Sequence, residues 1–90
     1  MIPRLKISIE RGDTVASYTS DVWTQILWER HFKRPISSIS ELGAEGVTRL
    51  GYIIAKHNGD EVPPTFEEWV KTATSWDVEK IQADPTPPVA

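Results

Sequence analysis

The sequence predicts a mainly α domain, in which a small N-terminal β-hairpin is followed by about three helices and a proline-rich tail. Three observations predict this fold: an alternating apolar pattern near the N-terminus, helix-start signals at separate places along the chain, and a C-terminal segment rich in proline. A chain of 90 residues suits one compact core. We therefore expect one domain over residues 1–83 and a flexible, disordered tail over residues 84–90.

The hairpin is expected over about residues 4–19. Apolar and polar residues alternate from Leu5 to Glu10, as they do in a strand with one buried face. Gly12-Asp13 suits a tight turn, because glycine tolerates the positive φ that such turns require. Both arms then present apolar side chains to the same face. The pairs that this turn predicts are Ile9 with Ala16 and Ile7 with Tyr18.

A first helix is expected from Ser20-Asp21, a favourable N-cap pair, to about Lys33, because Pro35 stops helical structure. Its apolar residues form two groups. The predicted core face, at i, i+3, i+4 spacing, consists of Val22, Trp23, Ile26 and Leu27. Trp28 and Phe32 lie four residues apart and form a second ridge.

A second helix is expected from a capping box at Ser38 to Glu41 and should end at Lys56 or His57, before Asn58-Gly59. Internal glycines are costly in a helix, so the strip of Gly43, Val47 and Gly51 indicates close packing. We expect a large aromatic residue, Trp23 or Trp69, to cover this strip. The predicted core face of the helix consists of Val47, Leu50, Gly51 and Ile54.

A short third helix is expected after Pro63-Pro64, with a second capping box from Thr65 to Glu68. Beyond it, the apolar pattern of residues 74–83 fits either a brief helix or an extended segment, and both alternatives stay open. The predicted apolar face of the third helix consists of Phe66, Trp69, Val70 and Ala73.

Composition and motifs exclude several classes of function. The net charge is −3 and the basic residues are scattered, which argues against nucleic-acid binding. The longest apolar run, around Tyr52 to Ala55, is too short to span a membrane. Cysteine is absent, so no disulfide can form, which fits a reducing compartment such as the cytoplasm. His31 and His57 lack the spacing of a metal pair. No phosphate-binding loop or nucleophile motif occurs, so we expect no cofactor, metal or catalytic residue and no enzymatic activity.

Aromatic residues supply the candidate binding site. The hairpin and two helices can hardly cover both sides of the first helix, so its second ridge is expected to be exposed. The predicted protein-binding residues are Trp28, Phe32 and Trp76. The alternative is a core that wraps further round the first helix and buries the ridge. Self-association through the same surface, giving a homo-oligomer, is a further expectation.

Three stretches of the sequence resemble the tail assembly chaperones of long-tailed bacteriophages. They are residues 21–30 (DVWTQILWER), residues 51–56 (GYIIAK) and residues 64–70 (PTFEEWV). The resemblance implies a small helical protein of the host cytoplasm that keeps the tape measure protein soluble while tube subunits polymerise around it. It implies no catalytic residues, and a longer form made by frameshifting would depart from the proline-rich tail.

We therefore predict a tail assembly chaperone that binds the tape measure protein, with the tail tube protein as a second candidate partner. Two alternatives share the absence of catalytic motifs. One is a structural virion component, such as a connector or tail-completion protein. The other is a regulatory module that docks on a host protein.

Overall fold

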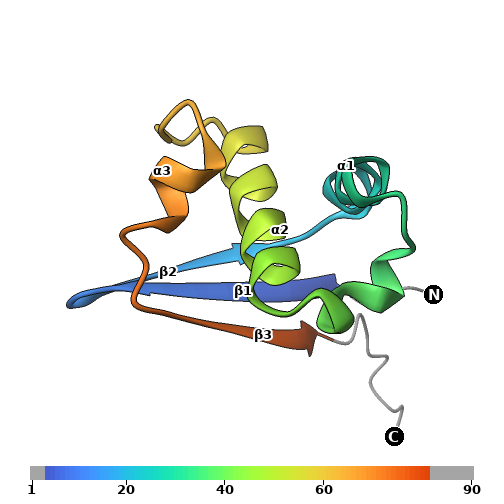
Figure 1. The fold of residues 1–90 in the computed structure, drawn as a ribbon, viewed down its shortest axis with the longest axis horizontal. Coiled ribbons are helices and arrows are strands. Elements are labelled where there is room, and N and C mark those ends of the chain that lie inside the picture. The colour runs from blue at the N-terminus through green and yellow to red at the C-terminus, as the bar shows by residue number, and fades with distance from the viewer. Residues whose placement is uncertain (1–3, 82–90) are drawn as a thin grey trace, which may run out of the picture.

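The computed structural model describes residues 4–81, which form a three-stranded antiparallel sheet with helices packed on one face (Figure 1). The strand order is β2-β1-β3, so the N-terminal strand lies in the centre. The elements in chain order are β1 (Arg4–Arg11), β2 (Thr14–Thr19), α1 (Val22–Phe32), the 3₁₀ helix η1 (Ile36–Leu42), α2 (Gly43–His57), α3 (Phe66–Val70) and β3 (Ser75–Ile81).

The prediction of a mainly α domain is wrong, because the protein is a small α+β domain. The hairpin is part of a larger sheet. Residues 75–81 add a third strand that pairs antiparallel with β1, with Ser8 opposite Asp77 and Ile9 opposite Trp76. The extended alternative for this segment is thus confirmed over the described residues. The predicted tail, residues 84–90, lies outside them, as do residues 82–83.

The predicted hairpin and its register are confirmed. Ile9 pairs with Ala16 and Ile7 pairs with Tyr18. Gly12 has a φ of 62° in the connecting turn, a conformation that glycine adopts without steric cost.

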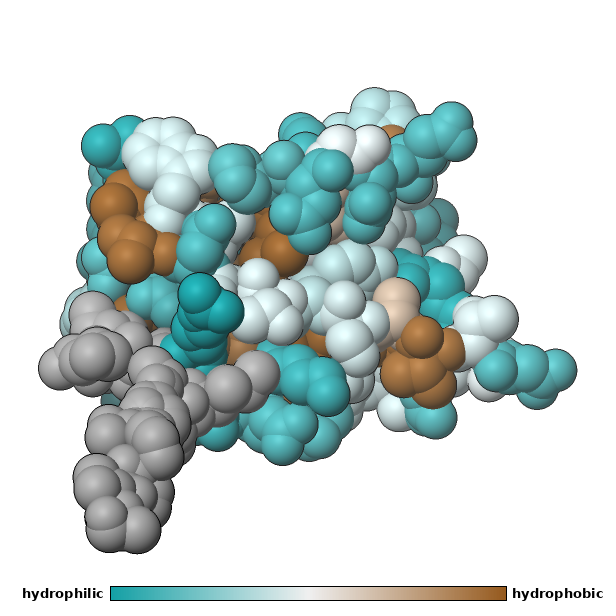
Figure 2. Space-filling view, turned by 180° about the vertical axis from the view of Figure 1, so that it is seen from behind, coloured by the Kyte–Doolittle hydropathy of each residue, from teal (hydrophilic) through white to brown (hydrophobic). Residues whose placement is uncertain are grey.

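The two faces of the sheet differ in chemistry. The inner face, which meets the helices, carries buried Leu5, Ile7 and Ile9 of β1. The outer face carries the intervening residues of β1 and β2, which are polar except for Val15, together with Asp77 and Glu79 of β3. On the side of the molecule shown in Figure 2, hydrophobic residues appear as separate patches among polar ones.

Helix α1 begins and ends where the sequence predicts, but it buries a different stripe. The buried residues are Thr24, Gln25 and Trp28, whereas Val22 and Trp23 are 74% and 45% exposed. Thr24 and Gln25 tolerate burial because their polar atoms are hydrogen-bonded; the amide of Gln25, for example, donates to Ser20 Oγ over 2.9 Å. The predicted core face of this helix is therefore wrong for Val22 and Trp23.

The second predicted helix is divided. Residues 36–42 form η1, and α2 begins only at Gly43, so the predicted capping box at Ser38 is wrong. The Ser38 hydroxyl instead donates to the carbonyl of Pro35, 2.7 Å away. The predicted end at His57 is confirmed, and so is the predicted core face, because Val47, Leu50, Gly51 and Ile54 are all buried.

Gly51 permits a close approach of three elements. A Cβ atom at this position would lie 3.3 Å from Ile7 Cγ2 of β1 and 3.3 Å from Trp69 Cη2 of α3. The expectation that Trp69 covers the glycine strip is thus confirmed at Gly51. Thr65 caps α3 by accepting from the backbone N–H of Glu68, as predicted. In the apolar face predicted for this helix, Phe66 and Trp69 are buried, whereas Val70 and Ala73 are half-buried and lie at or beyond the helix end.

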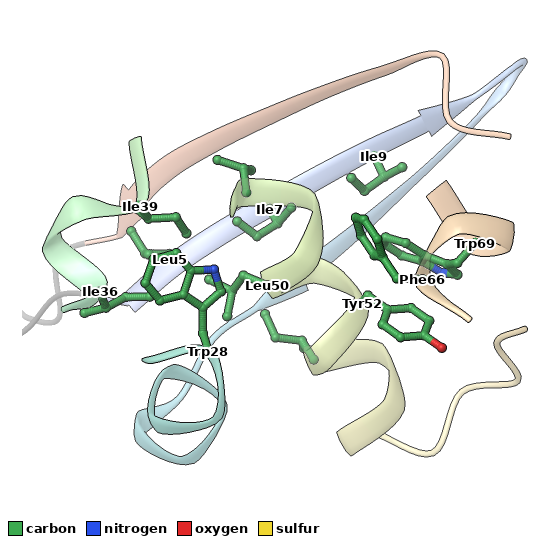
Figure 3. Packing of buried hydrophobic residues seen from close by; sticks show 12 residues of the cluster. Leu5, Ile7, Ile9, Trp28, Ile36, Ile39, Leu50, Tyr52, Phe66 and Trp69 are labelled. Atoms are coloured by element: carbon green, nitrogen blue, oxygen red, sulfur yellow. The ribbon is translucent and has the colours of Figure 1, made fainter. Parts of the chain in front are cut away.

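The core lies between the inner face of the sheet and the helices, and Trp28 fills one end of it (Figure 3). Trp28 is 0% exposed, and its Nε1–H donates to the carbonyl of Gly46 over 2.9 Å. Tyr52, Phe66 and Trp69 form an aromatic group at the other end, with ring centroids of Tyr52 and Trp69 5.4 Å apart. The indole hydrogen bond therefore joins α1 to the start of α2.

We expect Trp28→Phe to lower the free energy of unfolding by about 1–3 kcal/mol, because it removes packing volume and leaves the bond to Gly46 unmade. Urea denaturation measures this change. Trp23→Phe, at an exposed position of the same helix, serves as the control and should change stability by less than about 0.5 kcal/mol. Equal effects of the two substitutions would contradict the assignment of Trp28 to the core.

Asp21 should make the stability of α1 depend on pH. The backbone N–H of Thr24 donates to the Asp21 carboxylate over 2.8 Å, and this bond, with the nearby His57, lowers the pKa of Asp21. Because the folded-state pKa lies below the unfolded one, the stabilisation is complete above the unfolded pKa and is lost as pH falls through the folded pKa.

We therefore expect Asp21→Ala to lower the free energy of unfolding by about 1 kcal/mol at neutral pH and by less in acid. Urea denaturation at the two pH values measures both changes. Asp21→Asn, which keeps the cap and removes the charge, should change little with pH through this site. An undiminished loss for the alanine variant in acid would contradict the role of the carboxylate.

Candidate protein-binding surface

The three residues predicted to bind a protein do not form one surface. Trp28 is buried, so its predicted exposure is wrong, and the alternative of a core that wraps further round α1 holds at this position. Phe32 is half-buried, with its ring centroid 4.7 Å from that of Trp28. Trp76 is 41% exposed and pairs with Ile9, whereas Trp28 lies near Leu5 at the other end of β1 (Figure 3).

Trp76 lies on an open edge of the sheet. Leu5 and Ser20 form a hydrogen-bonded pair, in which the backbone N–H of Ser20 donates to the Leu5 carbonyl over 2.9 Å. In an antiparallel sheet, the backbone groups of successive residues point alternately to one neighbouring strand and to the other. Odd-numbered residues of β1 therefore bond to β2, and even-numbered residues bond to β3. With Ser8 opposite Asp77, the backbone groups of Trp76, Val78 and Lys80 therefore point away from β1. No strand in the described part of the chain pairs with them.

Two surface hollows adjoin this edge on its inner side. We call the edge residues Trp76, Val78 and Lys80, together with these hollows, the β3 edge. One hollow, of about 420 Å³, is lined by Trp76 and by residues of α2 and α3 that include Phe66 and Val70. The other, of about 440 Å³, lies between η1 and β3 and is lined by Leu5, Ile36, Ile39, Val78 and Lys80 among others.

Acidic residues surround the β3 edge. Asp77 and Glu79 project from the outer face of β3, and Glu45 and Glu67 line the hollow beside Trp76. Glu79 has a basic neighbour, Lys6, at 3.8 Å, but both side chains are well exposed, so this pair is weak. The surface therefore favours a partner that combines apolar with basic side chains.

The hairpin holds the start of β3 in place. The guanidinium of Arg11 donates to the carbonyl of Trp69 and to the hydroxyl of Thr72, over 3.0 and 2.9 Å, and lies over the Trp69 ring. Next to it, the backbone N–H of Thr74 donates to the Glu10 carbonyl over 2.7 Å. The Trp76 side chain thus extends from a fixed position on the sheet.

A third hollow, between α1 and α2, is lined by basic residues, among them His31, Arg49, Lys56 and His57. His31 and His57 are exposed, and His57 lies 3.9 Å from the Asp21 carboxylate. Among residues 4–81, no group of three or more histidine, aspartate or glutamate side chains is placed to hold a metal ion. Within the same range, no helix has the length and apolar character needed to cross a membrane.

The sequence singles out Trp76, which is exposed as expected, but does not indicate the sheet edge on which it lies. The alternation of Trp76 and Val78 with Asp77 and Glu79 was the available signal, yet so short a pattern fits more than one structure. Exposed Val15, Val22 and Trp23 were also missed as surface residues.

Comparisons of the chain with protein-family models, with curated proteins and with solved structures found no match. The fold and the site together describe a small α+β domain with an open, acidic sheet edge next to apolar hollows.

Proposed function

We propose that this protein is a non-enzymatic holding chaperone, which binds an extended segment of its client along the β3 edge as an added strand. The proposal rests on the backbone groups of Trp76, Val78 and Lys80, which point away from β1 and lie beside two apolar hollows. Strand addition gives affinity through the main chain, and pockets for alternate side chains give specificity.

The geometry defines the client segment. Residues of an added strand that lie opposite Trp76, Val78 and Lys80 face inward, so apolar side chains there enter the hollows. Residues opposite Asp77 and Glu79 face outward, where basic side chains are favoured. The expected client segment therefore alternates apolar and basic residues. Its first and last apolar positions, opposite Trp76 and Lys80, lie about 13 Å apart along the strand.

The resemblance to phage tail assembly chaperones suggests the client. We assign it as the tape measure protein, held in the host cytoplasm before the tail tube encloses it. The tail tube protein is the second candidate partner. A recovery of this chain in finished particles at fixed stoichiometry would instead favour a structural component, and capture of a host protein with no effect on tail assembly would favour a regulatory module.

Trp76→Ala should weaken binding of the tape measure protein by about 2 kcal/mol, roughly thirtyfold, because it removes the aromatic anchor of the β3 edge. Calorimetry or fluorescence anisotropy with the purified proteins measures the affinity. Trp23→Ala is the matched control, since Trp23 is similarly exposed but lies on α1. The proposal fails if both variants bind as tightly as the unmodified protein.

Lys80→Pro should also weaken binding, by about tenfold, because proline lacks the N–H that an added strand requires. The Lys80 N–H points away from β1, so the fold should tolerate this change as edge strands do. Glu79→Pro removes an N–H that faces β1 and should instead destabilise the domain. Circular dichroism and urea denaturation of both variants separate lost binding from lost folding; a well-folded Lys80→Pro that binds fully would argue against strand addition.

A further inference from the structure

The second open edge of the sheet, formed by β2, has a different chemistry from the β3 edge. The strand Thr14–Thr19 contains no charged residue and no proline or glycine. Soluble proteins usually protect exposed edge strands with charges, prolines or bulges, because unpaired backbone groups invite another strand. An uncharged edge is thus expected to be covered in the working form of the protein.

The backbone groups on this edge are available for pairing. Ser20 bonds to Leu5, so the even-numbered residues of β2 bond to β1 and the backbone groups of Val15, Ser17 and Thr19 point outward. No strand of the described residues pairs with them. The side chain of Val15, on the outer face, is 60% exposed.

We infer that two copies of this chain pair through β2, antiparallel and about a two-fold axis at Ala16. The three strands of each copy then form one continuous sheet. In this register Ala16 faces Ala16 of the second copy, Val15 faces its Ser17, and Thr14 faces its Tyr18. All of these pairs are neutral. A register centred on Ser17 would bring Asp13 opposite Asp21 of the second copy, which disfavours it.

The β3 edge is less suited to pairing with a copy of itself, because the registers centred on residues 77–79 bring acidic side chains together. A two-fold axis at Val78 would place Asp77 opposite Glu79 of the second copy, and an axis at Asp77 or Glu79 would place that acid opposite itself. Like charges directly opposite one another destabilise a sheet. Charge therefore selects β2 as the edge that meets a second copy.

The helices leave room for this pairing at the turn end of the hairpin. That end projects past the helices, whereas α1 lies near the opposite end of the sheet (Figure 1). Pairing centred on Ala16 extends from Thr14 to Tyr18 and so stops before the end of β2 that leads into α1. A contact made mainly by one pair of short strands is small, so the dimer should dissociate on dilution.

Charge substitutions test both the dimer and its register. Sedimentation equilibrium should show a monomer–dimer equilibrium for the unmodified chain. Val15→Lys combined with Ser17→Lys places lysine opposite lysine twice across the axis and should give a monomer. Val15→Lys combined with Ser17→Glu places lysine opposite glutamate and should restore the dimer. Both positions lie on the outer face, and circular dichroism checks that the variants fold.

Amide hydrogen exchange gives a second readout. The amides of Val15 and Ser17 should become slower to exchange as protein concentration rises, whereas those of Val78 and Lys80 should not. An unmodified chain that stays monomeric at millimolar concentration, or a double-lysine variant that still dimerises, would overturn the inference. The dimer does not depend on the proposed chaperone role, and the monomeric double-lysine variant should still bind the client through the β3 edge.

Discussion

The pairing of β1 on both of its sides is the constraint on which the rest of the structure depends. One side pairs with β2 through a tight turn, and the other pairs with β3, which lies more than sixty positions further along the chain. Ile7 and Ile9, both 0% exposed, project from this strand into the core. Helix α2 packs closely over them, because Gly51 has no side chain to keep Ile7 and Trp69 apart. The central strand thus fixes the core and leaves β2 and β3 as the two edges.

Hydrogen-bonded polar side chains determine which side of α1 is buried. Gln25 donates to the Ser20 hydroxyl, and that hydroxyl accepts from the backbone N–H of Leu5, so α1 is joined to the central strand by polar contacts. These bonds turn Trp28 into the core and leave Trp23 at the surface. A hydrophobic pattern alone suggests the opposite assignment, since it counts Gln25 as a surface residue. Hydrogen-bonded polar side chains are common in protein interiors, and here they set the orientation of the helix.

The elements that the sequence predicts well are those with local causes. The hairpin register follows from one turn, both ends of α1 follow from a cap and a proline, and the C-terminal end of α2 follows from an Asn-Gly pair. The third strand has no such local cause, because its partner is β1 at the other end of the chain. Its inner positions are Trp76, Val78 and Lys80, and a lysine there weakens the apolar alternation. The β3 edge follows from this pairing, so of the proposed binding surface only Trp76 could be predicted.

The different chemistry of the two edges also bears on how the protein avoids polymerising. A sheet with two open edges can in principle add copies without limit, because β2 of one copy pairs with β3 of the next in a head-to-tail array. Such an array would set Asp77 and Glu79 of each β3 beside an uncharged strand that supplies no further basic partner, so these acids gain no favourable charge pair from the contact. A β2–β2 contact instead joins two uncharged strands. Because it is two-fold symmetric, it covers the neutral edge of both copies. The inferred product is a closed pair with a β3 edge at each end, both open to the proposed client with its basic residues.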